Sequence, residues 1–514
     1  MLQDGEELAI LDVREELPFS ESHLLHARSA PLSRLELRAA RLVPRRDTRI
    51  VLVDGDGALT PAAAEVLIEQ GYRNLSVLAG GNAAWANAGY LLYSGVHVPS
   101  KAFGEIVEHA CHTPSIDAAR LKQMFDVRAD VLVVDSRPFD EFSRVSIPGA
   151  VNVPGAELVL RVPQLVNSAA TTVIVNCAGR TRSIIGAQSL INAGLPNEVV
   201  ALRNGTMGWT LAGYHPDRGR MDRLASTPAS AAAWAQAAAR KVGRATGVRH
   251  IDLPTLQEFR NDATRTLYVF DVRDPRDYET GHLAGATHAP GGQLVQATDY
   301  YIGTLNARVV LVDDLEVRAV MTASWLMQMG WSDVFVLVAS GNETGWPPIR
   351  LASPPDHSNL KISAAEAAKL LQLGPATFVD LSLSRDYVSG HIPGAWFAIR
   401  RRLHRAVSKI PLRGTIVLTS EDGMLAQLAV PEMQSLTDLP VRYLEGGNRA
   451  WAEAGQELTA ENPRLVDDPI DVWLKPYERP AQQEAAMNEY LSWEIDLAER
   501  VAQDPSCRFR PLVP

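Results

Sequence analysis

The chain has little cysteine, and its cysteines form no recognisable pair. Its 514 residues include only Cys111, Cys177 and Cys507, and no two of these have CxxC spacing. An odd number of scattered cysteines argues against a disulfide framework, so at least one thiol is expected to be free. No cluster of histidine and cysteine has the spacing of metal ligands, and the sequence therefore predicts no metal site.

Long apolar runs are also absent. No stretch reaches the roughly 18 unbroken apolar residues of a membrane span. The acidic start, Met1 to Glu7, lacks the basic and then apolar segments of an export signal. We therefore expect a cytoplasmic protein without a membrane partner. The net charge of −10 also disfavours nucleic acid as a partner, because phosphate binding needs a concentrated basic face.

A fourfold internal repeat runs through most of the chain. Each copy has an apolar run that ends in an aspartate, and these are Asp12, Asp135, Asp271 and Asp380. A second apolar run follows, and the residues at or just past its end are Asp54, Cys177, Asp313 and Ser420. The spacing between the two positions is 42 residues in three copies and 40 in the fourth. A Gly/Asn turn and a tryptophan then recur, at Trp85, Trp209, Trp346 and Trp451. Four copies in register indicate four related units.

The repeat pattern predicts α/β domains. Short continuous apolar runs alternate with helical patterns such as Ser183 to Ile191, which stops before Gly194. This alternation is typical of a small, mostly parallel sheet with helices on both faces. The chain also exceeds the about 250–300 residues that one core supports. We place the units at 1–100, 101–228, 229–350 and 351–460, with linkers around 94–115 and 214–250. A helical tail follows at 461–514, in which 480–500 reads as an amphipathic helix packed on a domain.

Each unit resembles a rhodanese domain over about residues 1–460. The marks are the Asp-x-Arg at the end of the first strand and a Gly-His-(Ile/Leu)-x-Gly-Ala turn, intact at Gly281–Ala286 and Gly390–Ala395. The second unit departs from this turn at Val145–Ala150, yet it alone has the active-site cysteine. The order resembles that of bacterial proteins with four rhodanese domains. The resemblance implies a thiosulfate sulfurtransferase-like enzyme without a cofactor, in which Cys177 carries a sulfane sulfur as a persulfide.

The first unit is expected to be shortened. Met1 lies only 11 residues before Asp12, which leaves little room for the helix that precedes the first strand elsewhere. A mis-assigned start would explain this.

The loop from Asn176 to Ser183 contains the candidate site residues. Cys177 is the predicted catalytic residue, and the predicted substrate-binding residues are Ala178, Gly179, Arg180, Thr181, Arg182 and Ser183. A thiolate at the start of the next helix would be favoured by the helix dipole and by the two arginines. The backbone, curled by Gly179, is expected to form a nest of N–H groups for an anion. We assign Arg182 to binding the donor, Arg180 to favouring the thiolate or lining the entrance, and Ser183 either to capping the helix or to solvent.

The expected partners are a small anionic sulfur donor and a thiol or cyanide acceptor. The loop matches neither the Arg-Lys-Gly pattern associated with thiosulfate nor the Gly-Ser/Thr-Gly pattern associated with mercaptopyruvate. Its two arginines favour thiosulfate or a related anionic persulfide source. The sequence does not decide whether the acceptor is a protein or whether the chain forms a homo-oligomer.

Two alternative functions are weighed against this one. A phosphatase or arsenate reductase of the related fold needs Cys-x5-Arg, but Arg182 comes one residue too early. A non-catalytic sulfur carrier or redox sensor would use Cys177 only to accept sulfur or oxidant.

Several other residues are interpreted as structural or incidental. Asp135 and Arg137 are expected to form a hydrogen-bonded pair, and Cys111 and Cys507 are expected to be incidental. The units with Asp54, Asp313 and Ser420 are expected to be inactive, serving as scaffold, access wall or docking surface. Arg318, which aligns with Arg182, is interpreted as a relic or a surface charge.

Overall fold

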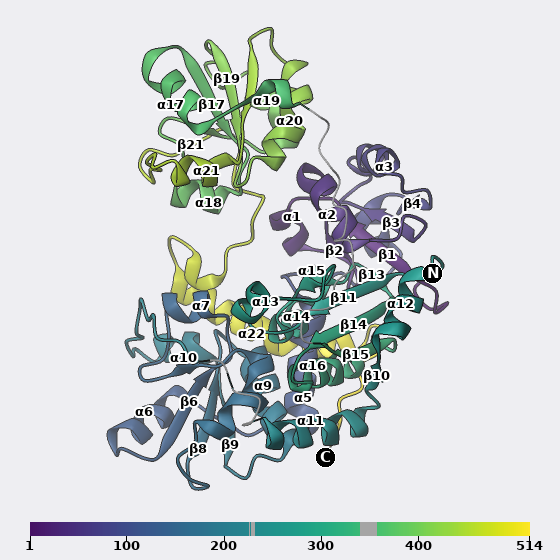
Figure 1. The fold of residues 1–514 in the computed structure, drawn as a ribbon, viewed down its shortest axis with the longest axis vertical. Helices are drawn as coiled ribbons and strands as arrows, with labels where there is room; N and C mark the ends of the chain where they lie inside the picture. The colour runs from purple at the N-terminus through teal and green to yellow at the C-terminus, as the bar shows by residue number, and fades with distance from the viewer. Residues whose placement is uncertain (226, 228–231, 340–356, 514) are drawn as a thin grey trace.

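The structure is a computed structural model that describes residues 1–225, 227, 232–339 and 357–513. It contains four sheets of parallel strands with helices around them, which confirms the predicted α/β class (Figure 1). The turn and tryptophan expected from Ser340 to Trp346, and the linker from Pro347 onwards as far as residue 356, lie outside the described residues. Among the residues described, no helix has both the length and the apolar character needed to cross a membrane.

The second unit shows the arrangement most completely. Its sheet has the strand order β5-β9-β8-β6-β7, in which all neighbours are parallel. Its strands are β5 (Ser115–Ile116), β6 (Val131–Asp135), β7 (Val151–Asn152), β8 (Thr172–Asn176) and β9 (Val199–Leu202). Its helices are α6 (Ala118–Asp126), α7 (Phe139–Arg144), α8 (Leu158–Arg161), α9 (Thr181–Ala193) and α10 (Gly205–Leu211). As predicted, α9 stops at Gly194, whose φ of +79° closes the helix.

The third and fourth units repeat this strand order. The third is β10 (Arg249–Ile251), β15 (Val334–Val338), β14 (Arg308–Asp313), β11 (Leu267–Asp271) and β12 (Thr287–His288). Its helices are α11 (Ala233–Thr246), α12 (Leu253–Asn261), α13 (Pro275–Thr280), α14 (Gly291–Gln296), α15 (Thr298–Tyr301) and α16 (Val317–Gln328). The fourth is β16 (Lys361–Ile362), β20 (Val441–Leu444), β19 (Thr415–Thr419), β17 (Ala376–Asp380), β18 (Trp396–Phe397) and β21 (Arg464–Leu465). Its helices are α17 (Ala364–Leu373), α18 (Ser384–Ser389), α19 (Leu403–Ala406), α20 (Met424–Gln434) and α21 (Gly447–Glu453).

The third unit contributes one short strand to the sheet of the first unit. Its strands are β1 (Leu8–Asp12), β2 (Arg28–Ser29), β3 (Arg49–Val53) and β4 (Leu75–Val77), and its helices are α1 (Glu16–Glu21), α2 (Leu35–Leu42), α3 (Thr60–Glu69) and α4 (Gly81–Asn87). The short strand β13 (Thr304–Leu305) of the third unit pairs antiparallel with β1. The first and third units are therefore joined by backbone hydrogen bonds as well as by side chains.

Strand register explains the repeat spacing. In all four units the aspartate that ends the first central strand lies opposite the last residue before the loop position. In the second unit, for example, Asp135 is paired with Asn176, directly before Cys177. In the first and third units Asp12 and Asp271 are paired with Val53 and Val312 in the same way. The constant spacing thus places each loop residue at the carboxyl edge of its sheet.

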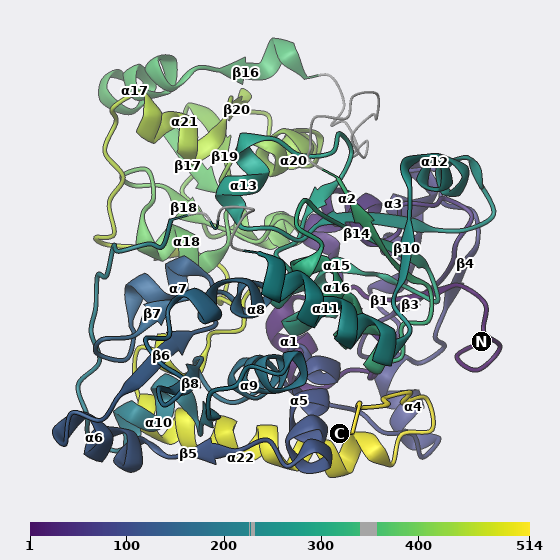
Figure 2. The same cartoon turned by 60° about the horizontal axis from the view of Figure 1, so that its bottom comes forward.

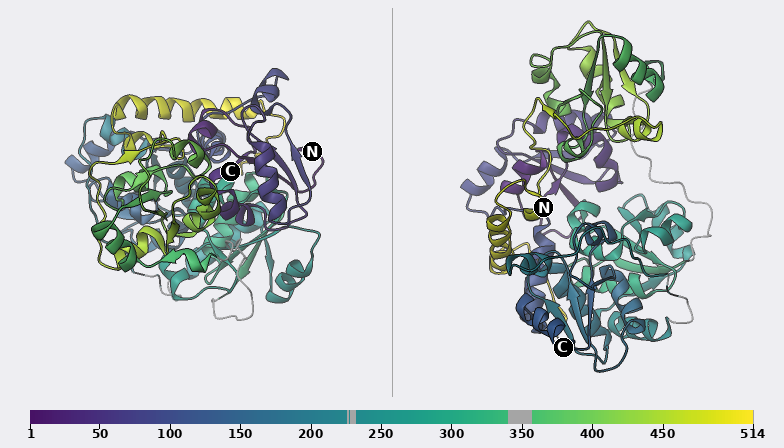
Figure 3. Two further views of the ribbon diagram at one scale, coloured as in Figure 1. Left: turned by 90° about the horizontal axis from the view of Figure 1, so that it is seen from above. Right: turned by 90° about the vertical axis from the view of Figure 1, so that its left-hand side faces the viewer.

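Two helices that lie outside the repeated pattern hold the units together. Helix α5 (Val98–Cys111) lies in the segment predicted as a linker, and α22 (Gln483–Ala502) is the predicted tail helix. Figure 2 shows α22 running along α5 and the second unit, and in Figure 3 the tail returns to them from the fourth unit at one end of the molecule. Leu497 and Val501 of α22 pack with Val98 and Ala102 of α5. The tail helix is therefore part of the hydrophobic packing that joins the units of the chain.

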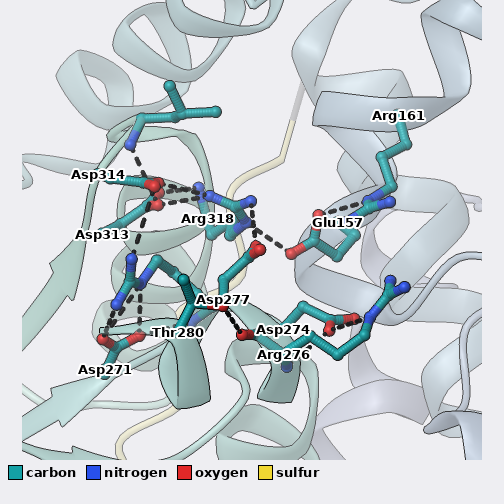
Figure 4. A network of polar contacts seen from close by, with 12 residues as sticks. Glu157, Arg161, Asp271, Asp274, Arg276, Asp277, Thr280, Asp313, Asp314 and Arg318 are labelled. Atoms are coloured by element: carbon teal, nitrogen blue, oxygen red, sulfur yellow. Dashed lines mark hydrogen bonds and ion pairs between the residues drawn. The ribbon is translucent and has the colours of Figure 1, made fainter. Parts of the chain in front are cut away.

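Arg318 joins the second and third units through buried ion pairs (Figure 4). Its Nε donates to Glu157 Oε1 of the second unit at 2.5 Å, and its Nη1 donates to Asp313 Oδ1 at 2.7 Å. Asp314 and Asp277 lie 3.0 Å and 3.3 Å from the same guanidinium. Arg318 is only 2% exposed. The interpretation of Arg318 as a relic or surface charge is therefore wrong, because its charge balances carboxylates that face one another across two units.

Replacing Arg318 by methionine is expected to destabilise the protein by about 3–5 kcal/mol, because it leaves the buried carboxylate of Asp313 without its cation and leaves Glu157 with Arg161 alone. The measurement is the midpoint of thermal unfolding, with Arg449→Met on the surface of α21 as the control. Equal midpoints for the two variants would contradict the assigned role.

Candidate active site

Cys177 lies at the carboxyl end of β8, where the chain turns into α9, and it is 2% exposed. The preceding Asn176 donates from Nδ2 to Asp135 Oδ2 at 2.8 Å. Arg137 Nε donates to Asp135 Oδ1 at 2.9 Å and its Nη2 to Oδ2 at 2.7 Å. The prediction that Asp135 and Arg137 form a structural pair is confirmed. This pair fixes the strand end from which the Cys177 loop departs.

Backbone N–H groups of helix α10 donate hydrogen bonds to carbonyl groups of the loop. The N–H of Thr206 donates to the Cys177 carbonyl at 2.9 Å, and that of Met207 donates to the Ala178 carbonyl at 3.0 Å. Because the C=O and N–H of one trans peptide point in opposite directions, the next N–H groups point away from α10. This orientation is the one that an anion nest requires.

The equivalent loops of the first and third units already hold a carboxylate in such a nest. Asp54 Oδ2 accepts from the N–H groups of Leu59 at 2.6 Å and Thr60 at 3.1 Å. Asp313 Oδ2 accepts from the N–H of Arg318 at 2.8 Å. These carboxylates occupy the position that Cys177 has in the second unit. In these two units the loop therefore adopts a conformation that binds an anionic group.

Arg180 lines the cavity and is tied to α5 by ion pairs. Its Nε donates to Glu105 Oε1 at 2.8 Å and its Nη2 to Glu105 Oε2 at 2.6 Å, and Nη2 also contacts Glu108. Burial raises the pKa of Glu105, and the guanidinium of Arg180 opposes this effect. These two carboxylates could not be predicted from the sequence, because the segment that contains them reads as a linker. They balance the charge of Arg180 and anchor the loop.

Arg182 is held at the cavity by Glu141 and Gln293. Its Nη2 lies 2.9 Å from Glu141 Oε2, and its Nη1 donates to Gln293 Oε1 of the third unit at 3.0 Å. Lys475 from the tail lies 3.2 Å from Glu141 Oε1. Burial by itself disfavours the carboxylate, but the charges of Arg182 and Lys475 outweigh it and hold the pKa of Glu141 well below its usual range. Burial also opposes the charge of Arg182, yet Glu141 and, to a lesser degree, Cys177 raise its pKa.

The start of α9 is fixed by the tail helix. Thr181 Oγ1 and Lys101 Nζ both donate to Glu494 Oε1 at 3.0 Å, and the Tyr490 hydroxyl donates to the same atom at 3.2 Å. Glu494 is 1% exposed. The amphipathic pattern of the tail predicts that α22 is packed, but no motif indicates that Glu494 lies against the Cys177 loop.

The hydroxyl of Ser183 has neither of the two roles predicted for it. Arg180 is the residue that precedes α9, and Ser183 is the third residue of the helix. The Ser183 hydroxyl is buried and donates to the Arg180 carbonyl at 2.7 Å. Both the predicted cap and the predicted solvated hydroxyl are therefore wrong, because the short side chain reaches back to the preceding turn.

A cavity of about 210 Å³ opens at the loop from Cys177 to Arg182. Every unit contributes to its wall: Glu16 comes from the first, Gln293 from the third and Arg385 from the fourth, while the tail supplies Tyr477 among others. In the described ranges, no group of three or more His, Cys, Asp or Glu side chains is arranged to hold a metal ion. The site thus combines one buried thiol with a cavity that has cationic side chains in its wall.

The family model of the rhodanese-like domain matches residues 1–88, 117–212, 254–343 and 363–454. The chain therefore belongs to the rhodanese family, with four tandem copies of the domain, which confirms the resemblance seen in the sequence. A crystal structure of thiosulfate sulfurtransferase from Pseudomonas aeruginosa is 44% identical, covers 99% of this chain and 97% of its own, and superposes with a TM-score of 0.93. The HTH-type transcriptional regulator Rv0324 of Mycobacterium tuberculosis is 33% identical over 90 residues, which are 18% of this chain and 39% of that relative.

Replacing Gly205 by alanine is expected to displace the Cys177 loop. Gly205 has a φ of +53°, and an added Cβ would lie 2.8 Å from the Gly179 carbonyl oxygen and even closer to that of Cys177. Gly213 has a φ of +79° with no atom within 4 Å of its added Cβ, so Gly213→Ala has similar backbone strain without the clash. We expect Gly205→Ala to lower the free energy of unfolding by about 1–3 kcal/mol more than Gly213→Ala. Hydrogen exchange should also be faster at residues 177–183, and equal exchange in the two variants would contradict the packing described.

Proposed function

We propose that the protein is a sulfurtransferase of the thiosulfate sulfurtransferase type and that Cys177 carries the transferred sulfur as a persulfide. The observation that carries this proposal is the position of Cys177. In the sister loops of the first and third units a carboxylate fills the nest, so the second loop offers the same N–H groups to a thiolate or persulfide. The likeness over the whole chain to a thiosulfate sulfurtransferase supports the same activity.

The proposed cycle has two displacements at sulfur. In the first, the Cys177 thiolate attacks the outer sulfur of the donor, the S–S bond of the donor breaks, and sulfite leaves with the electron pair when the donor is thiosulfate. In the second, a thiolate or cyanide acceptor attacks the outer sulfur of the persulfide, and the Cys177 thiolate leaves. Atoms and electrons balance without a redox partner, and the proposal includes no cofactor.

The loop residues have distinct proposed roles. The backbone from Ala178 to Arg182, including Gly179 and Thr181, holds the anionic sulfur by its N–H groups and by the positive end of α9. The N–H of Ser183 donates to the Arg180 carbonyl instead. Arg182 binds the anionic donor, because it lines the cavity and its charge interacts with Cys177. Arg180 keeps the loop in place through Glu105.

Changing Cys177 to serine is expected to abolish sulfur transfer. Wild-type protein incubated with thiosulfate should gain the mass of one sulfur atom on the peptide with Cys177, and cyanide should then remove it with repeated formation of thiocyanate. Cys111→Ser and Cys507→Ser are the matched controls and should retain activity. Burial raises the pKa of both of those thiols, which makes them poor nucleophiles at neutral pH.

The result distinguishes three cases. Failure of any donor to load Cys177 would overturn the proposal. Loading without turnover by any acceptor would make a sulfur carrier or redox sensor the better description. Turnover of a phosphate ester that is lost in Cys177→Ser would instead indicate a phosphatase.

A further inference from the structure

The tail forms the wall of the cavity beside Arg182. Trp473, Lys475 and Tyr477 all line the same cavity as Cys177, although more than 290 residues separate them from it in the chain. Lys475 Nζ and Arg182 Nη1 each lie 3.2 Å from the same oxygen, Oε1 of Glu141. Two cations from distant segments are therefore fixed beside one another by a single carboxylate.

These three charges do not cancel. Glu141 is held in its ionised form by the two cations, so the group formed by Arg182, Lys475 and Glu141 has one positive charge in excess. The side chain of Lys475 is 37% exposed, compared with 13% for Arg182 and 17% for Glu141. Lys475 is consequently the most accessible side chain of the three, and its ammonium group can bond to a ligand in the cavity without leaving Glu141.

Tyr477 adds a buried hydroxyl that lacks a partner. Within the described part of the chain its oxygen is buried and makes no hydrogen bond. Burial, reinforced by the charge of Glu141, raises the pKa of Tyr477, so the hydroxyl stays protonated and can donate. A buried polar atom without a partner is rare, and a ligand that offers an acceptor is a common reason for one. Arg182 and Tyr477 also interact electrostatically, which places the hydroxyl in the same part of the site.

We propose that Lys475 and Tyr477, together with Arg182, bind the sulfonyl end of the sulfur donor. Three donors of different shape, a guanidinium, an ammonium and a phenol hydroxyl, fit a group with several oxygens and a negative charge. The outer sulfur of the same donor then points to Cys177. The inference rests on the proposed function and specifies its substrate class as sulfonyl sulfur donors, which include thiosulfate and organic thiosulfonates.

The same contacts act on the leaving group. When the S–S bond of the donor breaks, the electron pair passes to the sulfonyl part, which leaves as sulfite from thiosulfate or as a sulfinate from a thiosulfonate. Lys475 and Tyr477 would stabilise the charge that develops there. They take no part in the second displacement, in which the acceptor meets only the persulfide.

The test compares the two half-reactions in Lys475→Gln and Tyr477→Phe. Loading of Cys177 by thiosulfate is expected to slow by about 10- to 100-fold in Lys475→Gln, as for the loss of a charged hydrogen bond, and by about 3- to 10-fold in Tyr477→Phe. Loading by glutathione persulfide, which has no sulfonyl group, and discharge by cyanide should stay close to wild type. Methanethiosulfonate anion, with one charge and two oxygens, should show a smaller loss than thiosulfate in Lys475→Gln.

Arg479→Gln is the matched control, since it removes a positive charge from the same segment at a residue that does not line the cavity. Thiosulfate loading that is equal in Lys475→Gln, Tyr477→Phe and Arg479→Gln would overturn the proposal while leaving the proposed function intact. An equal loss with thiosulfate and with glutathione persulfide would also overturn it, because that result indicates a damaged cavity. If no donor loads Cys177 in the wild type, the proposed function fails and this proposal fails with it.

Discussion

The ion pair between Arg180 and Glu105 is the interaction on which the site depends. It connects the Cys177 loop to α5, and α5 in turn packs against α9, α14, α15 and α22. Both partners are buried, and a buried charge that loses its partner is strongly unfavourable. Moving the loop away from α5 would therefore cost a large free energy. A single contact thus links the conformation of the loop to helices from the third unit and the tail. Arg182 has a different anchor, since Glu141 and Gln293 hold it in the wall of the cavity.

The four units share one architecture but differ in the residue at the loop position. In the first and third units the loop carboxylate fills the nest, and in the third unit Asp313 is further bound by Arg318. The N–H groups that bind these carboxylates are not available to an external anion. What these units supply to the cavity of the second unit is its wall, through residues such as Glu16 and Gln293. The repeated domain has become a scaffold that encloses one candidate site.

Much of the fold and the centre of the site could be predicted from the sequence, because both depend on local patterns. The spacing from Asp135 to Cys177 reflects strand register, and the loop and helix start follow from residue types next to one another. The contributions of Glu105, Glu494 and Lys475 could not be predicted. A glutamate on an amphipathic helix looks the same whether it faces solvent or a distant arginine. Ser183 shows the same limit on a smaller scale, since its hydroxyl is expected from the sequence to cap the helix or to face solvent and in the structure donates to the Arg180 carbonyl. Tertiary packing decides each of these cases.

The most direct measurement of the central claim is a crystal structure of the wild-type protein exposed to thiosulfate. The account predicts density for one additional sulfur atom bonded to Cys177 Sγ, with the loop still held by Arg180 on Glu105 and the new atom surrounded by the N–H groups that precede α9. An unmodified Cys177 in crystals where thiosulfate is bound at the cavity, or sulfur bound to Cys111 or Cys507 in its place, would contradict it.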